Sequence, residues 1–257
     1  MQKLTYSDLN FVLGRCPRDI VALLRKNAGF LFLAGGFIRS TISGEKVSDI
    51  DLFGVELGTR NAIEGIAKDL ALERKGRIYT TKNAITVLAS PRHPVQFITR
   101  WWYKRPEDLI ASFDFTVCQA VIWASRLPDT LDENGKKKQN YYFHSMCSDA
   151  FYPDLAAKRL VYTHPVRAEE AGGSLMRAFK FVKKGWSIQA PSIAGVVARL
   201  VWGAYDDPEK KPRNELWMAA VITGLLHEVD PLFIIDGVDL VDEHEVTQPQ
   251  EATVNEE

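Results

Sequence analysis

The chain alternates between short unbroken apolar runs and segments with the spacing and end signals of helices. Apolar runs of about four to eight residues that end at glycine, proline or polar residues are typical of strands in a buried sheet. They predict strands over residues 30–34, 50–55, 77–81, 84–89 and 95–100. Helical signals predict helices over 17–28, 37–42, 59–72, 106–112 and 148–159, a long helical stretch from residue 167, and helices over 193–205 and 214–227.

The order of these elements divides the chain into two parts and a tail. Strands and helices are mixed up to about residue 145, whereas the following elements are all helical. The sequence therefore predicts an α+β fold: a small mixed sheet with flanking helices over 1–145, then an all-α domain over 146–235. Residues 236–257 are acidic and lack a hydrophobic period, so we expect a disordered tail.

A polar stretch over residues 131–140 separates two apolar segments, 121–123 and 141–143. It contains an Asn-Gly pair followed by three consecutive lysines. This composition indicates a polar hairpin or a mobile loop. Lysines at a loop tip are usually only solvated, although these lysines could touch a nucleic-acid backbone.

Charge is distributed unevenly, although the net charge of the 257 residues is only −1. Residues 214–257 hold eleven Asp and Glu and no Lys or Arg, which leaves 32 basic and 22 acidic residues, a net charge of +10, in residues 1–213. A basic body suits a polyanionic partner such as RNA, DNA or a nucleoside triphosphate. The alternative is an ordinary solvated surface.

The remaining composition narrows the setting of the protein. Three widely spaced cysteines without a CxxC pair fit a reducing, cytoplasmic environment better than a disulfide framework or a zinc site. No apolar run approaches the length of a membrane span, so we expect no membrane partner. Nothing in the sequence specifies an oligomeric state.

The candidate chemistry is concentrated in residues 30–55. Asp49 and Asp51 are two residues apart at the start of a predicted strand, so their carboxylates face the same side. Adjacent carboxylates repel each other unless a cation lies between them, and Mg²⁺ with oxygen ligands fits such a pair. Upstream, Gly35 and Gly36 allow close approach of a phosphate to the backbone. The alternative is a surface turn followed by two solvated aspartates.

These residues carry a resemblance. The order of the Gly-Gly pair, a short helix with Arg39, and the Asp-Ile-Asp strand resembles the nucleotidyltransferase superfamily that includes DNA polymerase β, poly(A) polymerases and CCA-adding enzymes. The resemblance implies that Asp49 and Asp51 are catalytic and bind Mg²⁺. It also implies that Gly35, Gly36 and Arg39 bind the triphosphate of an incoming NTP.

A second motif, FDFTVCQA over 113–120, resembles the RDFTINA motif of CCA-adding enzymes and bacterial poly(A) polymerases. The resemblance implies that Asp114 contacts the ribose of the nucleotide. Phe113 and Cys118 replace the usual arginine and asparagine. A carboxylate between two phenylalanines requires a partner, so Asp114 is a ribose ligand, a third metal ligand, or an acceptor of backbone N–H groups.

A third motif, LMRAFKFVKKGWSI over 175–188, resembles the neck helix of the class II CCA-adding enzymes and poly(A) polymerases. On that alignment Glu170, Arg177 and the basic residue Lys180 match, and the resemblance assigns Arg177 and Lys180 to the phosphates or the base. Ala171 and Ser174 replace the aspartate and arginine that select the base in that family. CCA-type base selection is therefore not expected.

Two classes of function follow from the resemblance. The first is an Mg²⁺-dependent nucleotidyltransferase that moves a nucleoside monophosphate from an NTP to a hydroxyl acceptor, most simply a tRNA or other RNA 3′ end, with a protein hydroxyl as a variant. The second is a weakened or inactive relative that acts as a binding or structural subunit. Gln96 favours the second class because it stands where the family often has a third acidic residue.

Overall fold

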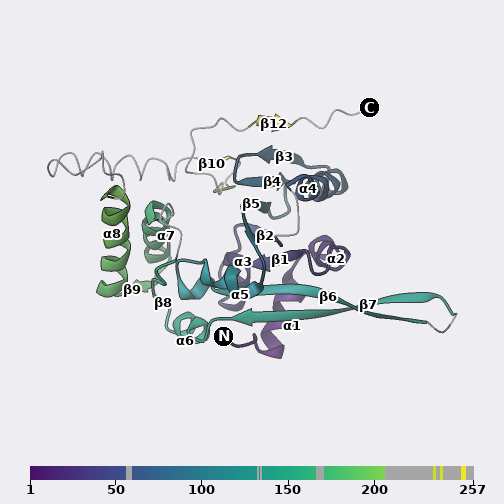
Figure 1. The fold of residues 1–257 in the computed structure, drawn as a ribbon, viewed down its shortest axis with the longest axis horizontal. Helices are drawn as coiled ribbons and strands as arrows, with labels where there is room; N and C mark the ends of the chain where they lie inside the picture. The colour runs from purple at the N-terminus through teal and green to yellow at the C-terminus, as the bar shows by residue number, and fades with distance from the viewer. Residues whose placement is uncertain are drawn as a thin grey trace.

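A single mixed β-sheet forms the centre of the protein in the computed structural model (Figure 1). The structure describes residues 1–55, 60–131, 133, 135–165, 171–205, 234–235, 238–239 and 250–252 of the chain. The strand order is β12-β3-β4-β5-β2-β1-β6-β7. Strands β2 and β5 are parallel, and the other neighbouring pairs are antiparallel. The strands are β1 (Leu31–Ala34), β2 (Ile50–Val55), β3 (Arg77–Thr80), β4 (Ala84–Leu88), β5 (Val95–Tyr103), β6 (Ala120–Leu131), β7 (Lys137–Cys147) and β12 (Gln250–Ala252).

Helices cover the sheet, and in sequence they precede its first strand, connect its strands and follow β7 (Figure 1). They are α1 (Tyr6–Arg15), α2 (Arg18–Lys26), α3 (Gly36–Ile42), α4 (Arg60–Arg74), α5 (Pro106–Ala111), the short 3-10 helix η1 (Thr116–Cys118), α6 (Phe151–Ala156), α7 (Ala171–Lys183) and α8 (Ala190–Tyr205). Helices α7 and α8 pack against each other beside the sheet domain. Among the described residues, no helix is long and apolar enough to cross a membrane.

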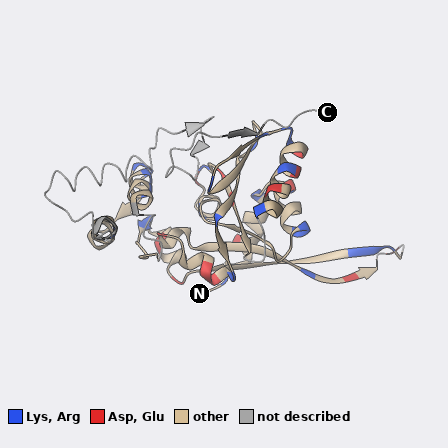
Figure 2. Ribbon diagram, turned by 45° about the horizontal axis from the view of Figure 1, so that its top comes forward, with Lys and Arg blue, Asp and Glu red and all other residues tan. Residues whose placement is uncertain are grey.

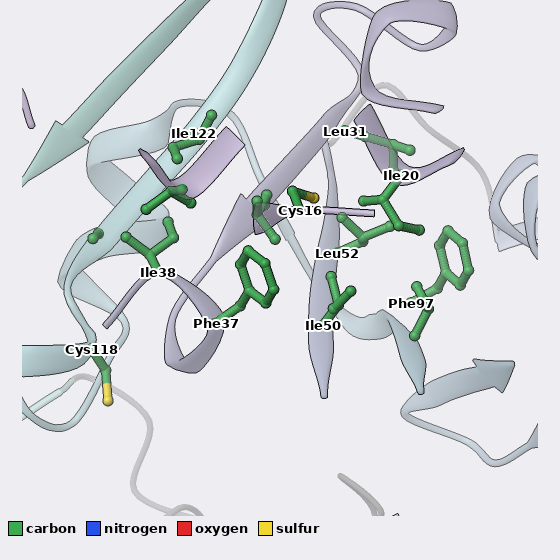
Figure 3. Packing of buried hydrophobic residues seen from close by; sticks show 14 of the residues in the cluster. Cys16, Ile20, Leu31, Phe37, Ile38, Ile50, Leu52, Phe97, Cys118 and Ile122 are labelled. Carbon is green, nitrogen blue, oxygen red and sulfur yellow. The ribbon is translucent and has the colours of Figure 1, made fainter. Parts of the chain in front are cut away.

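Side chains on the two faces of the sheet enter two separate cores, which explains why β1 is apolar at every position. Leu31 and Leu33 pack with apolar residues of α2, α3 and α4 in the larger core (Figure 3). Phe32 and Ala34 enter a smaller core that includes Leu109 and Ile110 of α5. Since successive side chains of a strand point to opposite faces, a strand between two cores needs an unbroken apolar run.

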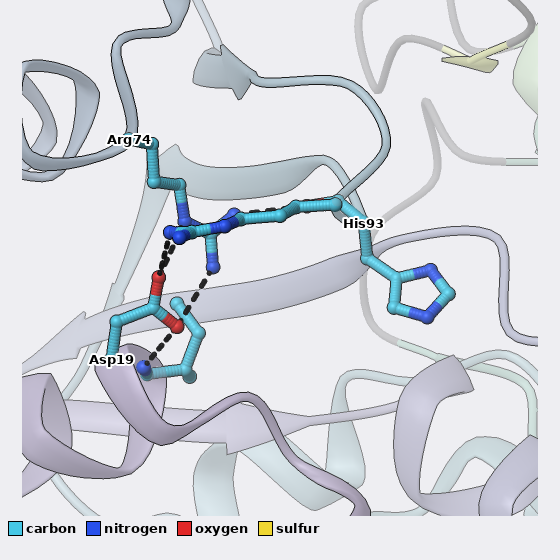
Figure 4. A network of polar contacts seen from close by, with 5 residues as sticks. Asp19, Arg74 and His93 are labelled. Carbon is cyan, nitrogen blue, oxygen red and sulfur yellow. Dashed lines mark hydrogen bonds and ion pairs between the residues drawn. The ribbon is translucent and has the colours of Figure 1, made fainter.

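A buried ion pair ties two of these helices together (Figure 4). Arg74 of α4 donates hydrogen bonds to both carboxylate oxygens of Asp19 of α2, at 2.8 and 3.1 Å, and to the backbone oxygen of His93 at 3.0 Å. Burial alone would raise the pKa of Asp19, but the hydrogen bonds and charge of Arg74 hold it below the ordinary value of 3.8.

Most of the predicted elements are confirmed. All five predicted strands are present as β1 to β5, and the helices predicted over 17–28, 37–42, 59–72, 106–112 and 193–205 are α2, α3, α4, α5 and α8. The helix predicted over 148–159 is wrong at both ends, because α6 covers only Phe151–Ala156. Arg159 and Leu160 instead form strand β8 (Arg159–Leu160), which pairs with β9 (Ser187–Ile188). Helix α1 was not predicted, and the helix predicted over 214–227 lies outside the described residues.

The predicted hairpin around residues 131–140 is longer than expected. Strands β6 and β7 pair from Ala120 and Cys147 out to Leu131 and Lys137, and the outer half projects beyond the body of the protein (Figures 1 and 2). We call residues 123–131 and 135–144 the arm; its inner end, at Trp123, still pairs with β1, and its outer end is the projecting part. Strand β10 (Ile234–Ile235), at the end of the predicted all-α domain, pairs with β11 (Val238–Asp239), and β12 pairs with β3. Strands β11 and β12 lie within residues 236–257, where the sequence predicts a disordered tail.

Candidate active site

The two predicted catalytic carboxylates lie at the start of β2. Asp49 immediately precedes the strand and Asp51 is its second residue. Asp49 is half-buried and accepts a hydrogen bond from Ser48 at 2.7 Å. The Oδ1 atom of Asp51 is buried and has no hydrogen-bond partner among the described residues. Burial, and then the charge of Asp49, raise the pKa of Asp51 well above 3.8, while Arg39 and Arg177 lower it.

A divalent cation fits this pair. A buried carboxylate oxygen without a partner, beside a second carboxylate, is unfavourable until a positive charge lies close to both. Mg²⁺ usually takes one or two protein carboxylates together with water and substrate phosphates. Within the described residues no group of three or more His, Cys, Asp and Glu side chains is placed to hold a metal. Gln96 of β5, fully buried, pairs in register with Asp51 on the parallel neighbouring strand.

The Gly-Gly pair forms the sharp connection between β1 and α3. Gly35 has φ 76°, a left-handed conformation that favours glycine. A Cβ atom at Gly35 would lie only 3.1 Å from the ring of Phe113. Phe113, which replaces the arginine of the resembling motif, therefore packs against this turn. Gly36 begins α3, and a Cβ atom there would lie 3.7 Å from Nη2 of Arg39.

Arg39 is buried beneath α7. Its guanidinium donates hydrogen bonds to Sγ of Cys118 at 3.4 Å and to Oγ of Ser40 at 3.0 Å, and it lies 4.5 Å from the ring centroid of Phe181. Its Nε is buried and has no hydrogen-bond partner within the described residues. Cys118, which replaces the asparagine of the motif, is thus an acceptor for Arg39. Burial raises the pKa of its thiol, which keeps it neutral.

Asp114 and Arg177 form an ion pair across the site. Nε of Arg177, on α7, donates to Oδ2 of Asp114 at 2.7 Å. Asp114 is buried, whereas the side chain of Arg177 is 40% exposed. The sequence left three roles open for Asp114, and none of them included this partner. The charges of Asp49, Arg39 and Arg177 all act on the pKa of Asp51, and Arg177 also pairs with Asp114. These five residues therefore belong to one site.

Helix α7 presents its other motif positions differently. Ser174 is fully buried and hydrogen-bonds to Tyr162. Lys180 lies one turn beyond Arg177 and is half-buried. Glu170 lies outside the described residues, as does the side chain of Ala171. The family that the motif resembles has an arginine at this position. Here the side chain of Ser174 is buried and bonded to Tyr162 instead.

Several residues that complete the site were not identified from the sequence. Phe181 stacks under Arg39, and the indole N–H of Trp186 donates to Oε1 of Glu45 at 2.7 Å, which ties the end of α7 to the chain after α3. The rings of Phe181 and Trp186 contact each other at 5.3 Å between centroids. Both aromatic residues lie inside the neck motif, so the motif was the available signal.

The sequence matches one protein family, described as Gabija anti-defense 2 family protein, over residues 5–158. The match covers more than half of the chain. The protein belongs to this Gad2 family. A comparison with curated proteins gives no match.

Comparison with solved structures shows that the Gad2 protein has the polymerase β-like nucleotidyltransferase fold. A CCA-adding enzyme of Thermotoga maritima in complex with tRNA is 15% identical, with a TM-score of 0.52 over 88% of this chain and 55% of that one. A tRNA-processing enzyme in an apo form is 18% identical, with a TM-score of 0.51 over 88% and 52%. A CCA-adding enzyme in complex with ATP is 15% identical, with a TM-score of 0.51 over 87% and 53%. The chain spans about half the length of these proteins. At these identities the comparison shows the fold alone.

Proposed function

We propose that this Gad2 protein is an Mg²⁺-dependent nucleotidyltransferase that transfers a nucleoside monophosphate from an NTP to a hydroxyl acceptor. The hydroxyl oxygen loses its proton and bonds to the α-phosphorus, and pyrophosphate leaves. The observation that carries the proposal is the pair of Asp49 and Asp51, in which Oδ1 of Asp51 is buried and has no hydrogen-bond partner among the described residues. A second buried atom, Nε of Arg39, which carries positive charge, also has no hydrogen-bond partner among the described residues, and this supports the proposal. The first atom suits a cation and the second suits a phosphate oxygen of the nucleotide.

Each residue has a defined task in this proposal. Asp49 and Asp51 would hold Mg²⁺, which when bound would supply charge neutralisation for the triphosphate and the attacking hydroxyl. Arg39, held in place by Cys118 and Phe181, presents fixed positive charge. Gly35 and Gly36 keep the backbone free of side chains at the turn before α3. Asp114, Arg177 and Lys180 would contact the ribose and the phosphates.

The first candidate acceptor is an RNA 3′ end, such as that of tRNA. The net charge of +10 over residues 1–213 favours a polyanionic partner, and the solved structures with this fold include complexes with tRNA, ATP and CTP. The second candidate is a hydroxyl of another protein. The family description, which names action against a defence system, favours it, as does the burial of Ser174 at a base-selecting position.

The test uses the full chain with Mg²⁺ and each α-labelled NTP in turn, with a bulk tRNA pool or a protein extract as acceptor. The inactive variant is Asp49→Asn with Asp51→Asn. The matched control is Asp69→Asn with Glu73→Gln, two exposed acidic residues of α4. Label on RNA or on protein that only the first variant abolishes would support transfer and identify the acceptor. Absence of transfer and of Mg²⁺-dependent NTP binding in the folded wild type would contradict the proposal and favour a binding subunit.

A further inference from the structure

One face of the arm carries a row of aromatic side chains. Trp123 of β6 lies opposite His144 of β7, and their rings stack at 5.2 Å between centroids with planes 15° apart. The ring of Tyr142 meets His144 edge-on at 4.7 Å. Ser125, opposite Tyr142, hydrogen-bonds to Nε2 of His144 at 2.7 Å and fixes that ring. These ring contacts and the hydrogen bond order the row.

The row starts beside the smaller core and runs outward to solvent. Trp123 packs at the edge of that core and is half-buried, whereas Tyr142 is 51% exposed. Beyond it on the same face come Leu127, 43% exposed, and its partner Asn140. An isolated two-stranded hairpin is at best marginally stable, so the exposed ring of Tyr142 on the arm is not explained by the stability of the sheet.

Three lysines lie near the tip of the arm, and one of them, Lys138, continues this face. Lys136, Lys137 and Lys138 are consecutive and exposed on the returning strand (Figure 2). Lys138 lies opposite Thr130, on the same face as Tyr142. The acidic side chain of Asp129 on the outgoing strand is paired with Arg126 at 3.1 Å, and Glu133 is exposed at the turn. The returning strand is thus basic beyond the aromatic row, without an acidic residue from Gly135 to Met146.

We propose that the arm binds single-stranded nucleic acid, with bases stacked on the row from His144 to Tyr142 and phosphates held by Lys136, Lys137 and Lys138. Aromatic rings on an open sheet face, next to basic side chains, recognise unstacked bases and the adjoining backbone. Lysine is depleted in protein–protein interfaces, which disfavours a protein on this face. A duplex offers no unstacked bases to the row.

The location of the arm relates this inference to the proposed function. Strand β6 begins at Ala120, two residues after Cys118 of the candidate active site, and runs to Leu131. At about 3.3 Å per residue the far end lies roughly 35 Å from the site. A single strand of nucleic acid bound along the arm could therefore reach Asp49 and Asp51 with one end. That placement rests on the proposed transfer reaction, whereas binding to the arm does not.

The experiment is fluorescence anisotropy with labelled oligouridine and oligothymidine, and with an RNA duplex of the same length, at several salt concentrations without NTP. Tyr142→Ser should weaken single-strand binding on the order of tenfold. The triple variant Lys136→Gln, Lys137→Gln, Lys138→Gln should lower the slope of log affinity against log salt by about 2, since each phosphate contact to a single strand contributes about 0.7.

Two matched control variants make the same substitutions at sites away from the proposed binding face. Tyr141→Ser alters a half-buried tyrosine on the opposite face of the same strand. Gln at Lys3, Lys26 and Lys68 removes three exposed lysines elsewhere. Both controls should bind like the wild type. The double variant Asp49→Asn, Asp51→Asn should also bind normally, which separates the arm from the transfer reaction.

Three results would overturn the inference. Single-strand affinity unchanged in both arm variants would show that the arm does not bind it. Preferential binding of the duplex through the same lysines, insensitive to Tyr142→Ser, would make the arm a backbone-contacting ribbon. Loss of a dimer in sedimentation, without loss of oligonucleotide binding, would make the arm a contact between two copies of the chain.

Discussion

At the scale of single residues, Asp51 combines burial with an unsatisfied oxygen and a neighbouring carboxylate. Each of these raises the free energy of the metal-free protein. Asp51→Asn removes the charge with almost no change in volume. We therefore expect the variant to be more stable than the wild type by about 1–3 kcal/mol in urea unfolding with a chelator present.

The control for Asp51→Asn is Asp69→Asn, an exposed carboxylate whose removal should change stability by under about 0.5 kcal/mol. Added Mg²⁺ should raise the midpoint of the wild type and leave Asp51→Asn unchanged. A less stable Asp51→Asn protein in the chelator would show that the carboxylate already has a partner.

Asp19 is the opposite kind of buried acid, because Arg74 satisfies both of its oxygens. Removing Arg74 leaves a buried carboxylate whose remaining partners are the exposed Arg92 and the backbone N–H of Ile20. Arg74→Met should cost about 3 kcal/mol of unfolding free energy. The comparison is Arg105→Met, which removes an exposed partner of Asp108 and should leave the unfolding midpoint nearly unchanged.

The same pair predicts a dependence on pH. The pKa of Asp19 is lower in the folded protein than its ordinary value of 3.8. Its contribution to stability is therefore complete above about 3.8 and is lost as the pH falls through the lower, folded value. Unfolding midpoints measured from pH 6 downward, in wild type and Asp19→Asn, should converge at the acidic end. Curves that stay parallel would contradict the prediction.

At the scale of elements, α7 is held over the site by contacts from its middle to just beyond its C-terminal end. Arg177 pairs with Asp114, Phe181 lies against Arg39, and Trp186 donates to Glu45. Trp186→Phe keeps an aromatic ring beside Phe181 but removes the hydrogen bond. We expect a loss of about 1 kcal/mol in stability and weaker NTP binding in calorimetry. Phe179 of α7 is 52% exposed, and Phe179→Ala should change neither the stability nor the NTP binding.

The contact between β2 and β5 gives a steric prediction. A Cβ atom at Gly54 would lie 2.4 Å from the ring of Trp102, too close without movement of the indole. Gly54→Ala should therefore destabilise the protein by about 1–3 kcal/mol. Gly14, within α1, has nothing within 4 Å of its Cβ position. Gly14→Ala should be stabilising by about 0.5–1 kcal/mol, because alanine favours a helix.

The elements also show what the sequence could specify. The apolar runs of β1 and β2 and the turn at Gly35 are local signals, so the strands, α3 and the pair of aspartates were predictable. The partner of Asp114 was not, because Arg177 lies 63 residues away and its approach depends on how α7 packs. The same reason applies to Arg39 and Cys118, which are 79 residues apart. The full length of β6 and β7 was missed because their outer halves are polar.

At the scale of the whole molecule, the body and the C-terminal segment have opposite charge, +10 over residues 1–213 and −11 over 214–257. A polyanionic segment of the same chain competes with RNA for the basic body. Removing residues 237–257 should therefore tighten RNA binding at low salt, as measured by anisotropy. Unchanged affinity at low salt would show that the segment does not compete.

Deletion of residues 237–257 also removes β12, which covers the edge of β3, and an uncovered edge can pair with other chains. The control therefore keeps the length and replaces Asp242, Glu243, Glu245, Glu256 and Glu257 by amides, outside β12. Tighter RNA binding in this variant would assign the effect to charge. An effect confined to the deletion would assign it to the edge of the sheet.

The wide separation of the paired residues has a consequence for synthesis on the ribosome. Strand β2 and its carboxylates emerge early, whereas β6, which flanks β1, and Arg177 on α7 emerge much later. Contacts between distant parts of a chain form late, since the intervening loop must close first. A nascent chain that ends before α7 has both aspartates but lacks Arg177, the partner of Asp114, and Phe181, which lies over Arg39. A nucleotide would then bind with its full set of contacts only after α7 has packed over the site.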